Sequence, residues 1–363
     1  MKRLIDAAEA LARAVDGVDW NAAQVDLACR RVLRAMAVAD AGALDAALAS
    51  LVDRLARGRV DDADGAAFAA ISGGSLVERG ADPAPLAEVL LARLPGVLAA
   101  ARRFADGCLA QLGDDILADG SVDRGGGDGG FDVDDRRIPL ALFRAQLGGD
   151  RGGGAALAYL RQWTLPAVAA LTRCRPLLER ATTDGPLAAA AALHRSDAGW
   201  LHVLLGVELD ARWRVLLPLD GRGFEVVVDG VVSNFDLHAL IAAALGGRGV
   251  ATADNPPALV AYLRSGGAEP PRSYVAGSWN LYGPGAAGFD LRDPAGVPQE
   301  HWVWGEGGPR DVPRVGGVAT ILLGPAAYER TWSAGRTFAA LAQDVRVVRE
   351  LTAAEVKAAL ATG

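Results

Sequence analysis

The chain has 363 residues, of which 51% are hydrophobic and 22% charged, and its formal net charge is −7 at pH 7. This composition is typical of a folded globular protein, and the length exceeds what one hydrophobic core usually serves, so we expect two domains. The acidic balance argues against a nucleic-acid partner, because proteins that bind DNA or RNA present a basic surface to the phosphates.

Arginine dominates the basic residues, since lysine occurs only at Lys2 and Lys357. Together with abundant alanine, this indicates a GC-rich bacterial genome rather than a nucleic-acid-binding surface. The most apolar windows, residues 86–101 and 155–171, are interrupted by charges and proline, so neither predicts a membrane span. Acidic residues also interrupt the stretch where a signal peptide would need its apolar core. We therefore expect a cytoplasmic protein without membrane association.

The first 195 residues predict a mostly α-helical domain. Apolar residues recur at helical spacing in segments 2–15, 22–39, 44–55, 155–182 and 186–194. Asp82-Pro83 predicts the start of another helix, because aspartate caps free amides and proline suits the first turn. That helix should run to about residue 112 and bend or break near Pro95. Alanine-rich helices offer few functional groups, so domain 1–195 is interpreted as a scaffold or docking domain.

Residues 114–135 interrupt this helical pattern with a run rich in aspartate and glycine. Low hydrophobicity, charge and glycine together predict a flexible loop. A calcium loop is the alternative, but the aspartates do not match the ligand spacing of an EF-hand.

From residue 196 the periodicity changes to the alternation typical of strands. Strands are predicted at 200–207, 213–219, 224–228, 273–282, 300–304, 318–323 and 345–349. Helices are predicted from Ser233, over 256–265 and from Thr352, where Glu355 occupies the capping-box position. The chain is therefore predicted to be α+β, with a helical domain at 1–195 followed by a mixed-sheet α+β domain at 196–363.

The second domain also holds three of the four histidines and 14 of the 21 aromatic residues. On a strand, Trp302 and Trp304 share one face, and His301 points to the other. Glycines around Glu306 predict a shaped loop at the end of that strand.

Two interpretations of this segment stay open. In the first, indole rings wall a pocket in which Glu306 or His301 acts as a catalytic acid or base. The residues expected to bind a ligand there are Trp279, Asn280, Trp302, Trp304, Arg310 and Arg336. In the second, the tryptophans fill the core and Glu306 pairs with Arg310 in a turn.

No metal-ligand spacing, nucleotide fingerprint or nucleophile elbow occurs, so no metal is predicted and no cofactor is identified. A metal site formed by residues that are far apart in the sequence is an alternative that the sequence leaves undecided. The leading hypothesis is a ligand-binding or adaptor protein whose partner, a protein or a small molecule, binds the Trp-rich domain. The alternative is an enzyme that uses Glu306 or His301 with an arginine anion clamp.

Overall fold

A computed structural model of the chain describes residues 2–14, 22–57, 63–112, 130–133, 136–250, 257–266, 274–284 and 302–361. The chain divides into two compact units, Met1–Leu205 and Gly206–Gly363. The switch between them follows Leu205 rather than residue 195.

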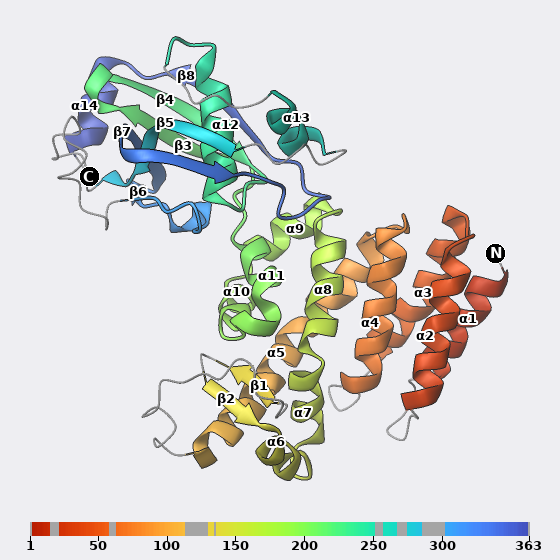
Figure 1. The fold of residues 1–363 in the computed structure, drawn as a ribbon. Coiled ribbons are helices and arrows are strands. Elements are labelled where there is room, and N and C mark those ends of the chain that lie inside the picture. Colours follow the sequence, from red (N-terminus) through yellow and green to blue (C-terminus); the bar gives the residue numbers. More distant parts are fainter. Residues whose placement is uncertain are drawn as a thin grey trace. The chain divides into compact units, whose positions relative to one another are not determined.

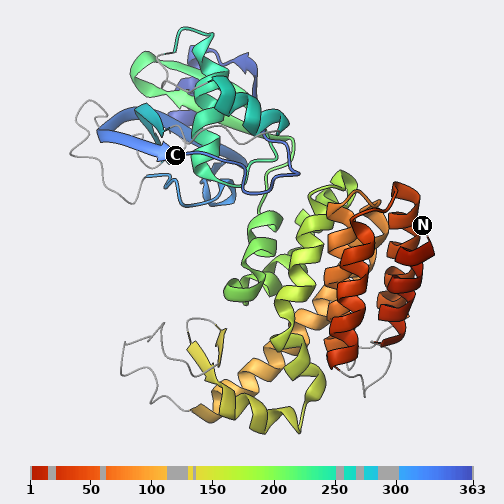
Figure 2. The same cartoon turned by 45° about the vertical axis from the view of Figure 1, so that its right-hand side comes forward.

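The N-terminal unit is helical, as predicted. Its helices are α1 (Lys2–Ala14), α2 (Ala22–Met36), α3 (Ala41–Arg57), α4 (Ala63–Glu78), α5 (Ala84–Leu112), α6 (Leu140–Leu147), α7 (Arg151–Ala158), α8 (Leu160–Leu171), α9 (Arg175–Thr182), α10 (Gly185–Ala192) and α11 (Arg195–Leu205). Helices α1 to α4 lie side by side in both views (Figures 1 and 2). Small and branched apolar side chains at helical spacing, such as Leu44, Leu48, Leu51 and Leu55, fill the space between them.

Helix α5 is the central helix of this unit. It continues through Pro95 as one element, and its buried residues include Leu90, Leu94, Leu98 and Cys108. Among the described residues it is the one helix long and apolar enough to cross a membrane by length and composition. Here it packs against α3, α7 and α8, as a core helix of a folded unit does.

The aspartate- and glycine-rich segment lies mostly outside the described residues. Its described part, β1 (Gly130–Val133), pairs antiparallel with β2 (Arg136–Pro139), so this part is a strand and not the predicted loop. Alternation explains the difference, because Val133 and Ile138 are buried and the Phe131 ring lies 4.4 Å from that of Phe143.

The strand predicted at 200–207 is wrong, because residues up to Leu205 belong to α11. Ala198, Leu201 and Leu204 are fully buried at a spacing of three residues, whereas Trp200 is 51% exposed. Helical packing of one apolar stripe thus outweighs the strand preference of the aromatic and branched residues.

The C-terminal unit is the predicted α+β fold around a mixed sheet. Its strands are β3 (Ala211–Leu217), β4 (Arg222–Asp229), β5 (Tyr274–Tyr282), β6 (Arg314–Val315), β7 (Val318–Ser333) and β8 (Asp344–Glu350), and its helices are α12 (Asn234–Gly246), α13 (Pro257–Ser265) and α14 (Ala353–Ala361). The strand order is β5-β7-β3-β4-β8, with β6 beside β7. Strands β3 and β7 are parallel, and the other pairs are antiparallel.

The two faces of the sheet carry different layers (Figure 1). On one face, Trp213, Val215 and Phe224 pack with the apolar residues of α12 and α13 in the main core. On the other, Leu216 and Leu322 pack with Val356 and Ala359 of α14 in a smaller cluster. The same face also carries the charged side chains of Arg214 and Glu225 and the buried polar side chains of Asn280 and Thr320.

Local capping signals are confirmed at two helices. The Ser233 hydroxyl accepts the backbone N–H of Phe235 at the start of α12. At α14, the Thr352 N–H donates to Glu355 at 2.8 Å and the Glu355 N–H donates to the Thr352 hydroxyl at 3.3 Å. This is the reciprocal arrangement of a capping box.

Candidate functional site

Trp302 is part of the small core cluster rather than an open pocket wall. It is 7% exposed, and its ring meets that of Tyr282 edge-on at 6.3 Å. Among the described residues it forms a single bridge with Tyr282, so the predicted strand at 300–304 is not a strand from Trp302 onward. His301 and Glu300 lie outside the described residues.

Trp304 and the predicted charged residues lie in the loop that follows. Trp304 is 43% exposed and its ring centroid is 5.4 Å from that of Trp302. Glu306 and Arg310 are exposed, and Arg310 forms a wide ion pair with Asp311 at 3.8 Å. The loop is held against the start of α12, where Asn234 donates its side-chain amide to the Trp304 carbonyl at 2.8 Å.

Trp279 and Asn280 lie on opposite faces of β5, as strand alternation requires. Trp279 belongs to the main core and stacks on His238 of α12 with ring centroids 4.1 Å apart. Asn280 is 2% exposed and shares the other face with Tyr282. These two predicted ligand-binding residues therefore do not converge on one space.

Arg336 takes a structural position near the end of α13. Its guanidinium donates to the Tyr262 carbonyl at 3.3 Å, and burial lowers its pKa. A cation at a helix C-terminus stabilises the last carbonyl groups. The structure thus distributes the sequence-predicted residues over the core, the α13 terminus and an exposed loop.

Asp236, a residue not predicted as functional, is a buried carboxyl group in the first turn of α12. It is 1% exposed and accepts hydrogen bonds from the Gly335 N–H at 2.8 Å and the Gln343 side chain at 3.0 Å. Burial raises the pKa of Asp236 to about 6 and outweighs those two hydrogen bonds, which favour the ionised form.

This shift predicts a pH-dependent stability. The folded state binds the Asp236 proton more tightly than the unfolded chain, so its contribution is complete below pH 4 and is lost as the pH rises to about 6. At neutral pH the ionised group then lowers the free energy of unfolding by on the order of 2–3 kcal/mol. Asp236→Asn removes that charge. The Gln343 amide can then rotate so that its Oε1, which has no hydrogen-bond partner in the described structure, accepts the new amide N–H of residue 236.

We expect Asp236→Asn to stabilise the C-terminal unit at pH 7.5 and to have little effect near pH 4. Urea unfolding at both pH values, compared with the unmodified chain, measures the difference, because the contributions of the other titrating groups are the same in both proteins. A difference between the two proteins that does not change with pH would contradict the buried-charge explanation.

A cavity of about 410 Å³ lies on the second face of the sheet beside α14. It is lined by Arg212, Arg214, Glu225, Val318, Arg349, Leu351, Glu355, Ala358 and Ala359. Leu351 and Ala359 also belong to the small core cluster that contains Trp302. One wall is therefore packed and apolar, and the other is charged.

The charged wall is built by register across three strands. Arg214 of β3 lies opposite Glu225 of β4, and Glu225 lies opposite Arg349 of β8. A bulge between Glu225 and Val226 leaves Val348 as the extra residue of β8. Because a one-residue shift reverses the face of a strand, this bulge brings Arg349 to the same face as Glu225.

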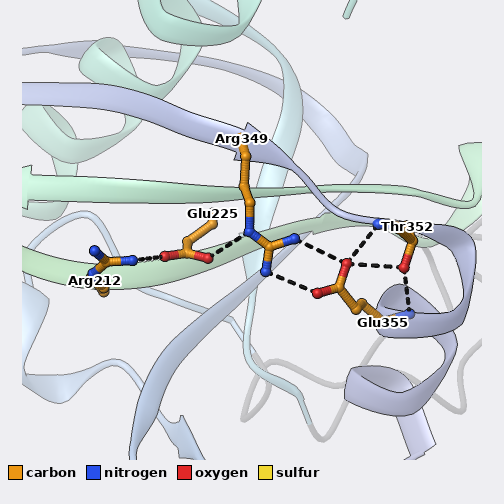
Figure 3. Close-up of polar contacts among 5 residues, drawn as sticks. All are labelled: Arg212, Glu225, Arg349, Thr352 and Glu355. Carbon is orange, nitrogen blue, oxygen red and sulfur yellow. Dashed lines mark hydrogen bonds and ion pairs between the residues drawn. The ribbon is translucent and has the colours of Figure 1, made fainter.

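Four of these side chains form a continuous chain of ion pairs (Figure 3). Glu225 accepts hydrogen bonds from Arg212 and, at 3.0 Å, from Arg349. Arg349 also donates twice to Glu355, at 2.9 and 3.0 Å, the bidentate geometry that suits a guanidinium and a carboxylate. The Thr352 cap completes the chain at the start of α14.

The arginines keep both carboxylates ionised. The hydrogen bond from Arg212, followed by that from Arg349, lowers the pKa of Glu225. The hydrogen bonds from Arg349 and Thr352 lower the pKa of Glu355 to about 2. Neither group holds a proton at neutral pH, so neither is suited to act as a general acid.

Arg214 differs from the other two arginines of the cavity. It is half-buried, and its guanidinium makes one long hydrogen bond, to the Val315 carbonyl at 3.5 Å. Within the described ranges no carboxylate lies at ion-pair distance from Arg214. Glu225, its cross-strand neighbour, instead forms its ion pairs with Arg212 and Arg349. A guanidinium in this position is available to a ligand.

Part of this site has a sequence signal. Arg212 and Arg214 alternate with Trp213 and Val215, as expected for a strand with one charged face. The position of Glu225 opposite Arg214 follows from the observed turn between Leu217 and Arg222. The contribution of Arg349 has no such signal, since it depends on a bulge and on a pairing 124 residues apart.

In the part of the chain that the structure describes, no three His, Cys, Asp or Glu side chains are close enough to hold a metal ion. No protein-family model matches the chain, and no curated protein or solved structure is significantly similar to it.

Proposed function

We propose that the C-terminal unit binds a small organic anion in the cavity beside α14, and that the chain is a ligand-binding protein of the bacterial cytoplasm. The observation that carries this proposal is Arg214, a half-buried guanidinium without a carboxylate partner among the described residues, in the wall of a 410 Å³ cavity. Pockets of roughly 300–1,000 Å³ with a few polar groups on an apolar wall are typical of small-molecule sites.

Charge supports an anion rather than a cation. The lining carries three arginines against Glu225 and Glu355, a formal charge of +1. Arg212 and Arg349 are held by the two carboxylates, so the unbalanced charge is that of Arg214. Binding an anion there would neutralise a partly desolvated cation, which favours the complex.

Binding is favoured over catalysis because both carboxylates in the cavity have lowered pKa values. The enzyme alternative rested on Glu306 and His301. Glu306 is exposed, and His301 lies outside the described residues. The helical unit keeps its interpretation as a scaffold or docking domain in this proposal.

Arg214→Gln tests the proposed site. We use benzoate as a simple small organic anion. We expect this variant to bind it roughly 10–100-fold more weakly than the unmodified chain does, because a hydrogen bond to a charged group contributes about 1.5–3 kcal/mol. Arg214→Lys should lie between them, since it keeps the charge but loses the planar fork. Calorimetric titration of the full chain gives the affinities.

Arg248→Gln is the matched control, because Arg248 is an exposed arginine of the same unit outside the cavity lining. It removes the same formal charge and should leave benzoate affinity unchanged. Equal losses in the two variants would indicate a general charge effect and would contradict a site at Arg214.

A further inference from the structure

We infer that the ligand of this cavity is a monoanionic carboxylate attached to an apolar body. This inference rests on the proposed binding function and adds the chemical class. It follows from three properties of the lining: the pairing of its charges, the nature of its opposite wall, and its size.

The charges select a single negative charge. Arg214 offers one guanidinium that has no carboxylate partner among the described residues, and the neighbouring Glu225 and Glu355 remain ionised. A dianion such as a phosphate monoester would double both its attraction to the arginines and its repulsion from these carboxylates, and it would leave the lining, whose formal charge is +1, with a net charge of −1 in a partly desolvated site. A carboxylate matches the guanidinium fork with two oxygens and brings one charge.

The opposite wall selects an apolar body. Val318, Leu351, Ala358 and Ala359 line it, and Leu351 and Ala359 are anchored in the cluster with Tyr282 and Trp302. This wall offers no charged group, so a ligand gains affinity there by removing apolar surface from water. An inorganic anion fills only the charged side.

The cavity volume of about 410 Å³ lies near the lower end of the range for small-molecule pockets. A compact body such as one ring or a short aliphatic chain is consistent with that volume. A nucleotide, with several anionic groups and a large polar body, fits neither the charge nor the wall.

Four probes separate these features: benzoate, acetate, benzyl alcohol and phenyl phosphate, each titrated at pH 7.5 into the full chain and into the Arg214→Gln variant. We expect benzoate to bind most tightly, with acetate and benzyl alcohol each weaker by about 10-fold or more, because each lacks one of the two features. Phenyl phosphate, a dianion at this pH, should also bind more weakly than benzoate.

A second variant tests the apolar wall without touching the charges. Val318→Thr keeps the side-chain shape and replaces one methyl group with a hydroxyl, so it should reduce benzoate binding and leave acetate binding unchanged. Val348→Thr is the control, since Val348 is 47% exposed on β8 and does not line the cavity. A merely structural effect of Val318→Thr would change both affinities together.

The outcomes distinguish the inference from the function beneath it. If phenyl phosphate or acetate binds as tightly as benzoate and loses affinity in Arg214→Gln, the site stands and the carboxylate class with an apolar body is overturned. If benzoate binds equally well to Arg214→Gln, or no probe binds in the millimolar range, both proposals are overturned.

Discussion

Replacing Gly230 with alanine is expected to destabilise the C-terminal unit by roughly 2–5 kcal/mol. Gly230 follows β4 with φ +69°, a conformation that costs an L residue about 1–2 kcal/mol. An added Cβ would also overlap the carbonyl oxygen of Ala342, a backbone atom that cannot rotate away. Overpacking of this kind costs about 1–3 kcal/mol. Since domains are stable by only about 5–15 kcal/mol, a large part of the stability would be lost.

Gly221→Ala separates the two causes. Gly221 has a similar φ of +62°, and an added Cβ there would meet no atom within 4 Å. This control should lose only the conformational part, about 1–2 kcal/mol. Hydrogen exchange of the β3 and β4 amides reports the stability of this unit separately from the helical unit. Equal losses in the two variants would contradict the close approach of Ala342 to Gly230.

The loop that carries Trp304 packs against α12, and replacing Gly305 with alanine is expected to release it from this helix. A Cβ at Gly305 would overlap the ring of Phe235. Displacement of the loop would also break the hydrogen bonds from Asn234 to the Trp304 and Gly307 carbonyls, at 2.8 and 3.1 Å. Overpacking and the lost hydrogen bonds together predict a destabilisation of about 2–4 kcal/mol.

The matched control is Gly247→Ala at the end of α12, where φ is −72° and an added Cβ meets nothing within 4 Å. It should be nearly neutral. Faster exchange of the Val303 and Gly307 amides and a red-shifted indole fluorescence would show the released loop. Unchanged exchange in Gly305→Ala would mean that the loop is not held by contact with Phe235.

Local signals in the sequence predicted much of this fold. The capping residues Ser233, Thr352 and Glu355 act on amides within three positions of themselves, so their effect depends little on the remainder of the chain. The hairpin of β3 and β4 is local too, and its two strands were predicted, although the turn that joins them lies between Leu217 and Arg222 and not between the predicted strand ends at 219 and 224. These elements agree with prediction because short-range hydrogen bonds determine them.

Tertiary packing decided the elements that were predicted wrongly. The residues from Trp200 to Leu205 have strand-forming side chains, but Leu201 and Leu204 are buried against the helical unit at helical spacing. Phe131 and Val133 sit among aspartates, and only their pairing with β2 makes them a strand. Neither contact is visible in a short window of sequence.

The candidate site shows the same limit. The sequence indicated that chemistry lies in the C-terminal part, and aromatic residues drew attention to Trp302 and Trp304. The cavity instead combines Arg214 of β3 with Arg349 of β8 and Glu355 of α14. Strand order and one bulge bring these residues together, and both are properties of the folded sheet.

The most direct test of the proposed anion site follows arginine and tryptophan side chains in one titration. In the full chain labelled with ¹⁵N-arginine and ¹⁵N-tryptophan, benzoate should shift the Nε–Hε signal of Arg214 saturably, with the signal assigned from its absence in Arg214→Gln. The signals of Arg248 and of the exposed Trp304 indole should stay in place. A saturable shift of Trp304 or Arg310 with Arg214 unmoved would contradict the account and move the site to the loop that the sequence alone predicted.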